Sequence, residues 1–371
     1  AMLKSNPFIE CVHLDDNYIG DYGVMAILQA AMGHNRLKEL ALEKNSFTRL
    51  TMMSREQQGQ NGAMSGHRGF ALSLQRNCNL VIGDGGVKGV FLKEICRLAV
   101  MKCSICSGWE EFLMALVGMP RLRWLDMSSN GISGEHVRGA VDFFPDAFKG
   151  VEYLDLSRNV LGMTHLDALP KLLPAIVALK LQGSSIGGQG LKKLADGLKY
   201  CRELKRLDLS RNPSNSTDGA FAVADLIQTH STLEVLDVSF CHFNDKSGAT
   251  IFEAVESAAR LTELNLAHNS LSDSCLEKVS SFGKLKSLNL SANKFTNTGL
   301  SSLGNKVIRS LDLNSLEIIS NCYCHIGLTV LLLLCRKAAN LLYITVDYST
   351  SGDNGAIQQK IDRGFYPFEI K

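Results

Sequence analysis

The chain has 371 residues, 45% of them hydrophobic, and a chain of this length ordinarily divides into several globular domains unless it is a repeat array. Its 39 lysines and arginines nearly balance 37 aspartates and glutamates, which excludes a nucleic-acid binder that works by bulk positive charge. The longest apolar stretch, 326–335, is about half the ~20 residues that a membrane-spanning helix needs. Eleven cysteines, an odd number in a long chain, fit reduced thiols better than a disulfide scaffold. We therefore expect a folded cytoplasmic protein without a membrane span.

One sequence frame recurs along nearly the whole chain: Leu-x-x-Leu-x-Leu-x-x-Asn, with another apolar residue two places after the asparagine. Copies that keep the asparagine begin at Ile9, Leu37, Leu122, Val151, Leu204, Leu261 and Leu285. Copies in which Ser184, Cys241 or Ser349 replaces it begin at Ile176, Leu233 and Leu341, and a copy from Ile308 has Leu316 at that position. Most copies lie 23 to 29 residues apart, which is the period of leucine-rich repeats.

The frame has a simple physical interpretation. Side chains alternate along a strand, so the two leucines of Leu-x-Leu enter the core while the residue between them faces outward. The asparagine then turns the chain and bonds backbone groups of a neighbouring coil, which serine or cysteine can do less completely. Between frames, Leu191, Leu194, Ala195 and Leu198 form a helical apolar stripe, so we expect about one helix per repeat.

This pattern resembles the ribonuclease-inhibitor-like subclass of leucine-rich repeat proteins. The resemblance implies an α/β solenoid of horseshoe shape, with parallel strands on the concave face and helices on the convex face. It predicts a single leucine-rich repeat domain of about 13 repeats over residues 1–371. Residues 3–8 look like the end of a preceding helix, and Phe365, Phe368 and Ile370 repeat the first, fourth and sixth positions of the frame as a last strand. We therefore expect the array to belong to a longer protein.

The region 48–120 is less regular, and we expect an irregular or inserted segment there. Residues 51–69 lack periodicity and are predicted to form a surface loop. Two partial copies of the frame occur in the region, one at Leu72, Leu74 and Asn77, the other at Leu98, Met101, Cys103 and Cys106, with Cys106 at the turn position.

Motifs that could carry chemistry have structural explanations. The glycine-rich string 82–89 could cradle a phosphate, but similar glycines occur at 19–24 and 186–191, where the repeat begins its helix. The pair Cys103 and Cys106 stands alone, whereas a structural zinc needs four converging ligands. An open solenoid groove is also a poor place to exclude water for catalysis. We predict no enzyme activity, no catalytic residue, no metal and no cofactor.

The outward positions of the strands are the candidate site. The residue between the two leucines forms an acidic or amide stripe made of Asp126, Asp155, Lys180, Asp208, Asp237, Asn265, Asn289 and Asp312. One interpretation is that Leu-Asp-Leu-Ser is simply a favoured form of the repeat. The other is a partner surface, because tryptophan, tyrosine and arginine dominate binding energy at interfaces. The predicted partner-binding residues are Trp124, Asp126, Tyr153, Asp155, Arg158, Asp208, Arg211, Asp237 and Phe240.

The predicted function is a non-catalytic protein-interaction scaffold that binds a protein partner, cytoskeletal or a small GTPase, through its concave face. Two alternatives stay open. Asp-Leu-Ser-Arg-Asn at 155–159 and 208–212 resembles an arginine-bearing turn of RanGAP-type GTPase activators. The segment 357–363 is similar to the end of the CARMIL and tropomodulin-like arrays, which implies a structural repeat in a cytoskeletal assembly. The apolar stretch 326–334 is predicted either to be buried beneath the terminal segment or to form an exposed patch.

Overall fold

The computed structural model describes residues 2–32, 34, 36–45, 49–51, 70–75, 81–83, 95–214, 217–346 and 369–370. They fall into two compact units, Ala1–Ser184 (unit 1) and Ser185–Lys371 (unit 2). The single leucine-rich repeat domain expected from the sequence over residues 1–371 stays a prediction.

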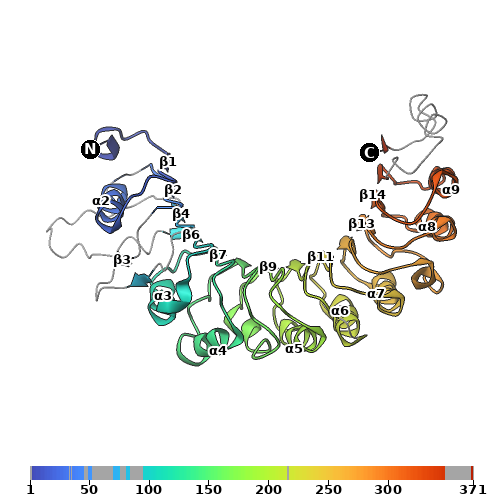
Figure 1. The fold of residues 1–371 in the computed structure, drawn as a ribbon, viewed down its shortest axis with the longest axis horizontal. Helices are drawn as coiled ribbons and strands as arrows, with labels where there is room; N and C mark the ends of the chain where they lie inside the picture. The colour runs from blue at the N-terminus through green and yellow to red at the C-terminus, as the bar shows by residue number, and fades with distance from the viewer. Residues whose placement is uncertain are drawn as a thin grey trace. The chain divides into compact units, whose positions relative to one another are not determined.

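Unit 1 is a parallel sheet with helices on one side (Figure 1). Its strands follow the order β1 (Cys11–His13), β2 (Glu39–Ala41), β4 (Phe70–Ser73), β6 (Ile95–Ala99), β7 (Trp124–Asp126), β8 (Tyr153–Asp155) and β9 (Ala178–Lys180). The helical segments are α1 (Met2–Ser5), α2 (Asp21–Met32), η3 (Ile105–Gly108), α3 (Trp109–Val117), α4 (Gly134–Phe143) and η4 (Leu169–Leu172). A separate parallel pair is formed by β3 (Arg49–Thr51) and β5 (Val81–Gly83).

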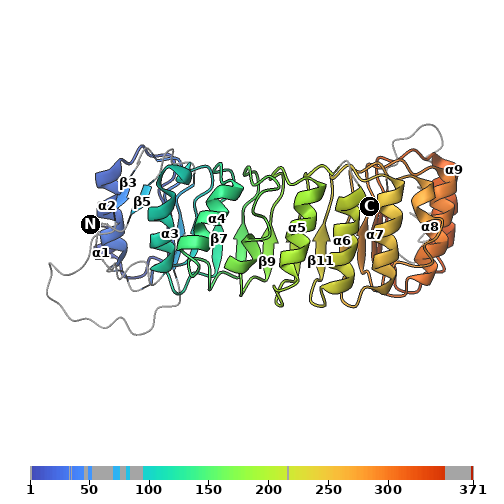
Figure 2. The same ribbon diagram turned by 90° about the horizontal axis from the view of Figure 1, so that it is seen from below.

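Unit 2 repeats the arrangement: α5, α6 and α7 lie side by side, η5 lies between α7 and α8, and α8 packs against α9 (Figure 2). Its strands are β10 (Arg206–Asp208), β11 (Val235–Asp237), β12 (Glu263–Asn265), β13 (Ser287–Asn289), β14 (Ser315–Glu317), β15 (Tyr343–Thr345) and β16 (Glu369–Ile370). Its helical segments are α5 (Gly188–Leu198), α6 (Thr217–Thr229), α7 (Asp245–Ser257), η5 (Asp273–Leu276), α8 (Asn297–Arg309) and α9 (His325–Cys335). In both units, we call the side of the sheet away from the helices the strand face.

The leucines of the frame form the core, as the sequence predicts. Leu125 and Leu154 are directly opposite each other on β7 and β8, and both are 0% exposed. In unit 2, Leu236 and Leu264 pair in the same way and are equally buried. A single coil cannot shield its leucines, so each coil buries the apolar side of its neighbour. The leucine-rich repeat solenoid fold is confirmed, with strands on one side and helices on the other.

Buried asparagines at the turn position join consecutive coils. The Asn269 side chain accepts hydrogen bonds from the N–H groups of Cys241 and Phe243 at 3.1 and 3.0 Å, and it donates to the carbonyls of Val238 and Leu266 at 3.1 and 2.9 Å. Equivalent bridges to the preceding coil are made by Asn45, Asn130, Asn159, Asn293 and Asn321. These side chains satisfy backbone groups that the stacking of coils removes from water.

Serine or cysteine at the turn position makes a weaker version of this bridge. The Ser184 hydroxyl donates to the Leu156 carbonyl at 3.0 Å. The Cys241 thiol donates to the Leu209 carbonyl at 3.4 Å, and burial raises its pKa to about 12, which keeps the thiol protonated. A hydroxyl or thiol has one hydrogen to donate, whereas the asparagine amide has two.

The residue before the turn position has a left-handed backbone in every coil for which the structure describes that residue. Non-glycine residues with φ between 50° and 59° at this position are Asp16, Lys44, Lys102, Ser129, Arg158, Arg211, Phe240, His268, Ala292 and Ser320. Such a conformation costs roughly 1–2 kcal/mol outside glycine. Each N–H is aimed at the next coil; that of His268, for example, donates to the Ser291 carbonyl at 2.8 Å. The left-handed residue therefore marks the frame independently of the leucines.

This marker corrects the predicted copy at Ile308. Leu316 lies in β14, opposite Leu288, and Asn321 occupies the turn position of this coil. The copy therefore begins at Leu313, and Leu311 is 67% exposed. The predicted outward residue Asp312 was wrong, because Leu311-Asp312-Leu313 imitates the Leu-Asp-Leu of a strand. Glu317 takes that place.

Two other parts of the frame also differ from the prediction. Leu98 lies opposite Leu125, so this copy begins at Ile95 and Cys103, not Cys106, occupies the turn position. The Cys103 N–H accordingly donates to the Asn130 side chain at 2.8 Å. Residues 95–120 are thus a regular coil at the end of the predicted irregular region 48–120. Ile370 pairs with Ile344 at the fourth position rather than at the predicted sixth.

Several predicted features lie outside the described residues. They include most of the surface loop 51–69, the glycine string from Asp84 onward and the segment 357–363. The apolar stretch 326–334 forms most of α9, which buries Leu328, Leu331 and Leu332 but leaves Ile326 59% and Leu333 41% exposed. In the part of the chain that the structure describes, no helix has the length and apolarity required to cross a bilayer.

The asparagine bridges generate the first prediction. Replacing Asn269 with alanine leaves two buried N–H groups and two carbonyls without their partner, so we expect the free energy of unfolding to fall by roughly 3 kcal/mol or more. Asn269→Cys copies the residue found at position 241, and it should lower the free energy of unfolding by about half as much as Asn269→Ala. Urea denaturation measures both values. The exposed Asn305→Ala in α8 serves as a control and should stay within about 0.5 kcal/mol of the parent. Equal effects at Asn269 and Asn305 would contradict the role of the bridge.

A buried histidine generates the second prediction. His230 follows α6, its Nε2 atom lies 3.2 Å from the Leu198 carbonyl oxygen, and burial lowers its pKa below the ordinary value of 6.5. The unfolded chain therefore binds this proton more readily than the folded chain, and stability falls as the pH drops below ~6.5. We expect the free energy of unfolding to decrease between about pH 7.5 and about pH 5.5, and to decrease less in His230→Gln. An identical pH dependence in both proteins would exclude His230 as a contributor.

Candidate interaction site on the strand face

Four side chains from consecutive strands form a stack on the strand face of unit 1. The Trp124 and Tyr153 rings lie parallel, with centroids 4.9 Å apart and an interplanar angle of 7°. The Arg97 guanidinium carbon lies 4.7 Å from the Trp124 centroid, and the Lys180 ammonium nitrogen lies 5.7 Å from the Tyr153 centroid. The rings are half-buried, and a cation covers each end of the pair. We call these four residues the aromatic stack.

The strand register explains the stack. Arg97, Trp124 and Tyr153 occupy the same outward position on β6, β7 and β8, and adjacent strands lie about 4.8 Å apart. Flat side chains at one position of neighbouring strands are therefore brought to stacking distance by the backbone itself. The rigid backbone spacing fixes the rings before any partner arrives, which reduces the entropy lost on binding.

A pair of carboxylates lies beside the aromatic stack. Asp126 and Asp155 are directly opposite each other, and Lys180 takes the next place in the same row. One oxygen of each aspartate accepts the backbone N–H of the serine two residues later, Ser128 or Ser157, at 2.9 Å. Burial raises the pKa of Asp126, the negative charge of Asp155 adds to this effect, and the Ser128 hydrogen bonds oppose it.

The local hydrogen bonds support the first interpretation of Leu-Asp-Leu-Ser, in which the aspartate stabilises the turn. Asp208 and Asp237 in unit 2 accept the N–H groups of Ser210 and Ser239 in the same way, also at 2.9 Å. Each such bond uses one carboxylate oxygen. In Asp237, Oδ1 also accepts the Ser239 hydroxyl at 2.7 Å, and Oδ2 accepts the Asn265 amide at 2.9 Å. The aspartates therefore have a structural role, which does not remove their charge from the strand face.

Unit 2 carries a second ring stack at the edge of its strand face. The Arg211 guanidinium carbon lies 4.0 Å from the centroid of Phe240, and the His268 ring stacks on Phe240 with centroids 3.9 Å apart. All three residues precede a turn position and have the left-handed backbone described above. Arg158 occupies the equivalent position in unit 1 and is exposed.

A groove lies next to the aromatic stack in unit 1. Its volume is about 400 Å³. It is lined by His13, Asp15, Glu39, Ala41, Glu43, Leu72, Ser73, Gln75, Arg97, Ala99 and Trp124. All of these come from coils of β1 to β7, so the groove opens on the strand face of a single unit.

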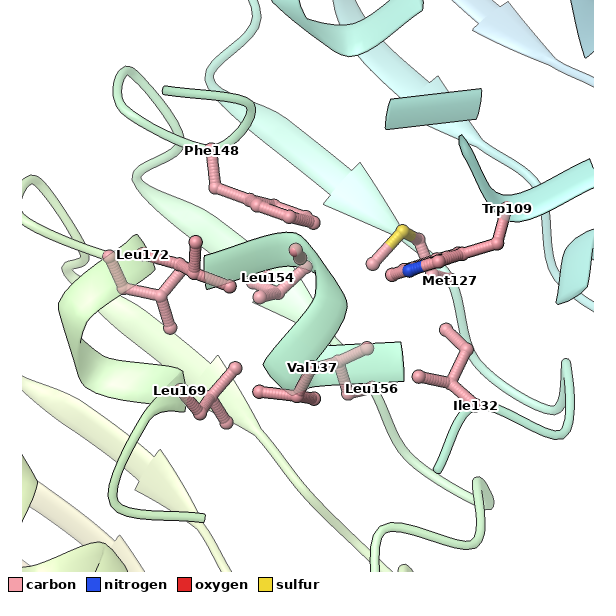
Figure 3. Close-up of a pocket in the computed structure, with 11 residues that line it drawn as sticks. Trp109, Met127, Ile132, Val137, Phe148, Leu154, Leu156, Leu169 and Leu172 are labelled. Carbon is pink, nitrogen blue, oxygen red and sulfur yellow. The ribbon is translucent and has the colours of Figure 1, made fainter. Parts of the chain in front are cut away.

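A small apolar void lies between the helices and the strands of the same coils. Figure 3 shows an apolar cavity between α3, α4 and the strands, where Trp109, Met127 and Phe148 converge with Val137 and Leu154. Its volume is about 10 Å³, and its walls have no exposed polar atoms. A void of this size without polar partners does not hold a water molecule. It belongs to the core that supports the aromatic strands.

The cysteine pair singled out in the sequence is bonded to backbone carbonyls. The Cys103 thiol donates to the Leu74 carbonyl at 3.0 Å, and the Cys106 thiol donates to the Asn130 carbonyl at 3.3 Å. Among the residues that the structure describes, no group of three histidine, cysteine, aspartate or glutamate side chains could hold a metal ion.

The structure thus brings together several of the residues predicted from the sequence. In unit 1, Trp124 is stacked on Tyr153 and Asp126 is opposite Asp155. In unit 2, Arg211 is stacked on Phe240 and Asp208 is opposite Asp237. Sequence reasoning missed Arg97 and His268. The corrected frame would have found both, because Arg97 precedes Leu98 as Trp124 precedes Leu125, and His268 precedes Asn269 as Arg211 precedes Asn212.

Comparison with known proteins agrees with this geometry. A family model described as "Leucine Rich repeat" matches residues 5–28, 229–252, 260–280 and 284–304. The ribonuclease inhibitor of Mus musculus is 24% identical over 333 residues, which cover 87% of this chain and 66% of that protein. A Tonsoku-like protein of Danio rerio is 33% identical over 222 residues, which cover 54% of this chain but 15% of that protein. The chain therefore spans only part of these relatives.

Solved structures share the fold. An internalin of Listeria monocytogenes superposes with a TM-score of 0.51 at 17% identity, covering 94% of this chain and 88% of that chain. TLR13 in its complex with ssRNA13 also reaches 0.51, at 18% identity, covering 93% of this chain and 54% of that chain. The chain has the leucine-rich repeat fold, and its repeats are similar to those of the ribonuclease inhibitors.

The aromatic stack generates the third prediction. A stacked ring pair contributes about 0.5–1.5 kcal/mol beyond the area that it buries. We therefore expect a coupling energy of that size between Trp124→Ala and Tyr153→Ala in a double-mutant cycle of unfolding free energies. The pair Trp124→Ala and Phe143→Ala is the control, because Phe143 lies on α4 and is 75% exposed. Its effects should add within about 0.5 kcal/mol. Simple additivity for Trp124 and Tyr153 would show that the rings do not stack in solution.

Proposed function

We propose that this chain is a non-catalytic, cytoplasmic protein-interaction scaffold that holds a protein partner on its strand face. The observation that carries the proposal is the aromatic stack, in which Trp124 and Tyr153 are half-buried, parallel and fixed between Arg97 and Lys180. Aromatic and arginine side chains supply most of the energy at protein interfaces, and rigid rings lose little entropy on binding. The second ring stack, Arg211 with Phe240 and His268, offers the same chemistry on unit 2.

The neighbouring charges support a protein partner of mixed polarity. Asp126 and Asp155 lie beside the rings, and the surface ion pair of Arg123 with Glu152 immediately precedes β7 and β8. In unit 2, the ion pair of Lys205 with Glu234 immediately precedes β10 and β11. Such charges steer association and set specificity more than they add affinity. A central aromatic pair with a charged surround is the usual anatomy of a protein interface.

The geometry does not single out either alternative predicted from the sequence. An activator of a small GTPase would need an arginine free to reach a nucleotide. Arg158 is exposed, whereas the Arg211 guanidinium carbon lies 4.0 Å from the Phe240 ring centroid. A purely structural repeat in a cytoskeletal assembly would bind through its helices. Both alternatives become outcomes of the experiment below.

Quantitative affinity purification with the full chain tests the proposal. The stack variant is Trp124→Ala with Tyr153→Ala. The matched control is Met114→Ala with Phe143→Ala, which removes two exposed apolar side chains from α3 and α4 of the same unit. We expect proteins retained by the parent and the control to be depleted at least about tenfold with the stack variant.

Two other outcomes would favour the alternative functions. Retention by the stack variant together with loss in the control would contradict the proposal and favour assembly through the helices. If the chain raised GTP turnover of a Ran-type GTPase and Arg158→Ala or Arg211→Ala abolished the effect, the activator would replace the scaffold.

A further inference from the structure

The groove on unit 1 is created by a run of small residues. The outward position that carries Asp126 and Asp155 on β7 and β8 carries Ala41, Ser73 and Ala99 on β2, β4 and β6. These three residues are in register with one another, and they lie between His13 on β1 and Asp126 on β7. Four strand spacings of about 4.8 Å separate the two ends, roughly 19 Å in all. The hollow of about 400 Å³ is therefore a trough with a floor of small side chains.

The two ends of the trough differ in chemistry. Three carboxylates, Asp15, Glu39 and Glu43, line the end formed by the coils of β1 and β2. At the other end are Arg97 and the Trp124 ring that its guanidinium covers. With His13 neutral, three negative charges against one positive charge leave the lining with a formal charge of −2.

Hydrogen bonds fix two of the three carboxylates. Asp15 accepts the Glu43 backbone N–H at 2.7 Å, and Glu43 accepts the Ser73 hydroxyl at 2.8 Å. Within the described ranges, Glu39 is exposed and makes no ion pair or side-chain hydrogen bond. Asp15 and Glu43 are thus arranged before any ligand arrives, as a specific site requires, and Glu39 is accessible to a ligand.

We propose that the trough receives a lysine or arginine side chain from an extended segment of the protein partner, which deepens the proposed function and rests on it. The cationic head donates hydrogen bonds to the carboxylates of Glu39, Asp15 and Glu43. Such charge-assisted hydrogen bonds are stronger than those between neutral groups. The aliphatic stem lies over the small floor formed by Ala41, Ser73 and Ala99, as long basic side chains do on apolar surface. Arg97 is held on Trp124 at the far end, so it does not neutralise the carboxylates. An acidic segment would face uncompensated repulsion in the same trough.

The experiment uses the full chain and defined peptides. Fluorescence anisotropy compares three labelled short peptides in which serine alternates with arginine, glutamate or glutamine. Two variants test the trough separately from the aromatic stack. Glu39→Lys reverses the charge of its most exposed carboxylate, and Ser73→Leu fills its floor without changing charge. Glu111→Lys on α3 is the matched control, because it makes the same charge reversal on the exposed helix side of the same unit.

We expect the arginine peptide to bind the parent and Glu111→Lys equally, and both trough variants at least about tenfold more weakly. The glutamate and glutamine peptides should bind weakly to all four proteins. If Glu39→Lys and Glu111→Lys weakened binding of the arginine peptide equally, the effect would be one of general charge and the inference would be overturned. Tighter binding of the glutamate peptide than of the arginine peptide would also overturn it. So would parent-like binding of the arginine peptide to Ser73→Leu.

The outcomes separate this inference from the proposed function. If Glu39→Lys and Ser73→Leu retain the purified partner while Trp124→Ala with Tyr153→Ala loses it, the trough is not a site and the scaffold proposal stands. If the variant of the two rings retains the partner, the scaffold proposal fails whatever the peptides do.

Discussion

The structure depends on one interaction, the bridge that a buried side chain at each turn makes to the backbone of the preceding coil. A coil of about 28 residues is too small to have a core of its own, so it must stack, and stacking removes backbone N–H and C=O groups from water. An asparagine amide has the two donors and the oxygen needed to bond several of these groups at once, as Asn269 does. Because the bridge recurs at the same point in the coils from Asn45 to Asn321 whose turn positions are described, it also fixes the register of the strands.

That register determines what the strand face can do. Neighbouring strands lie about 4.8 Å apart, so residues at the same outward position of successive strands form a row of adjacent side chains. One row gives the aromatic stack of Arg97, Trp124 and Tyr153. The row beside it runs from small residues, Ala41 to Ala99, into the carboxylates of Asp126 and Asp155. A rigid aromatic surface and a trough thus lie side by side without any loop having to fold for the purpose.

Much of this could be predicted from the sequence, because the leucine frame and the outward positions follow from strand alternation alone. Errors arose where a local imitation of the frame competed with the true one. Leu311-Asp312-Leu313 looks like a strand but follows α8, and only Asn321 and the left-handed Ser320 reveal the correct copy. Because the predicted copy began at Leu98, it placed Arg97 outside the strand. The residue at one end of the aromatic stack was therefore missed. Ring stacking and the trough could not be predicted, because both depend on side-chain packing across several coils.

Hydroxyl-radical footprinting of the complex with a partner retained by the chain tests the central claim most directly, since four oxidisable side chains report on the two sides of unit 1. Trp124 and Tyr153 lie on the strand face, and Met114 and Phe143 lie exposed on α3 and α4. Binding through the aromatic stack predicts that the partner lowers oxidation of Trp124 and Tyr153 and leaves Met114 and Phe143 unchanged. Protection of Met114 and Phe143 with unchanged oxidation of the two stacked rings would contradict the account.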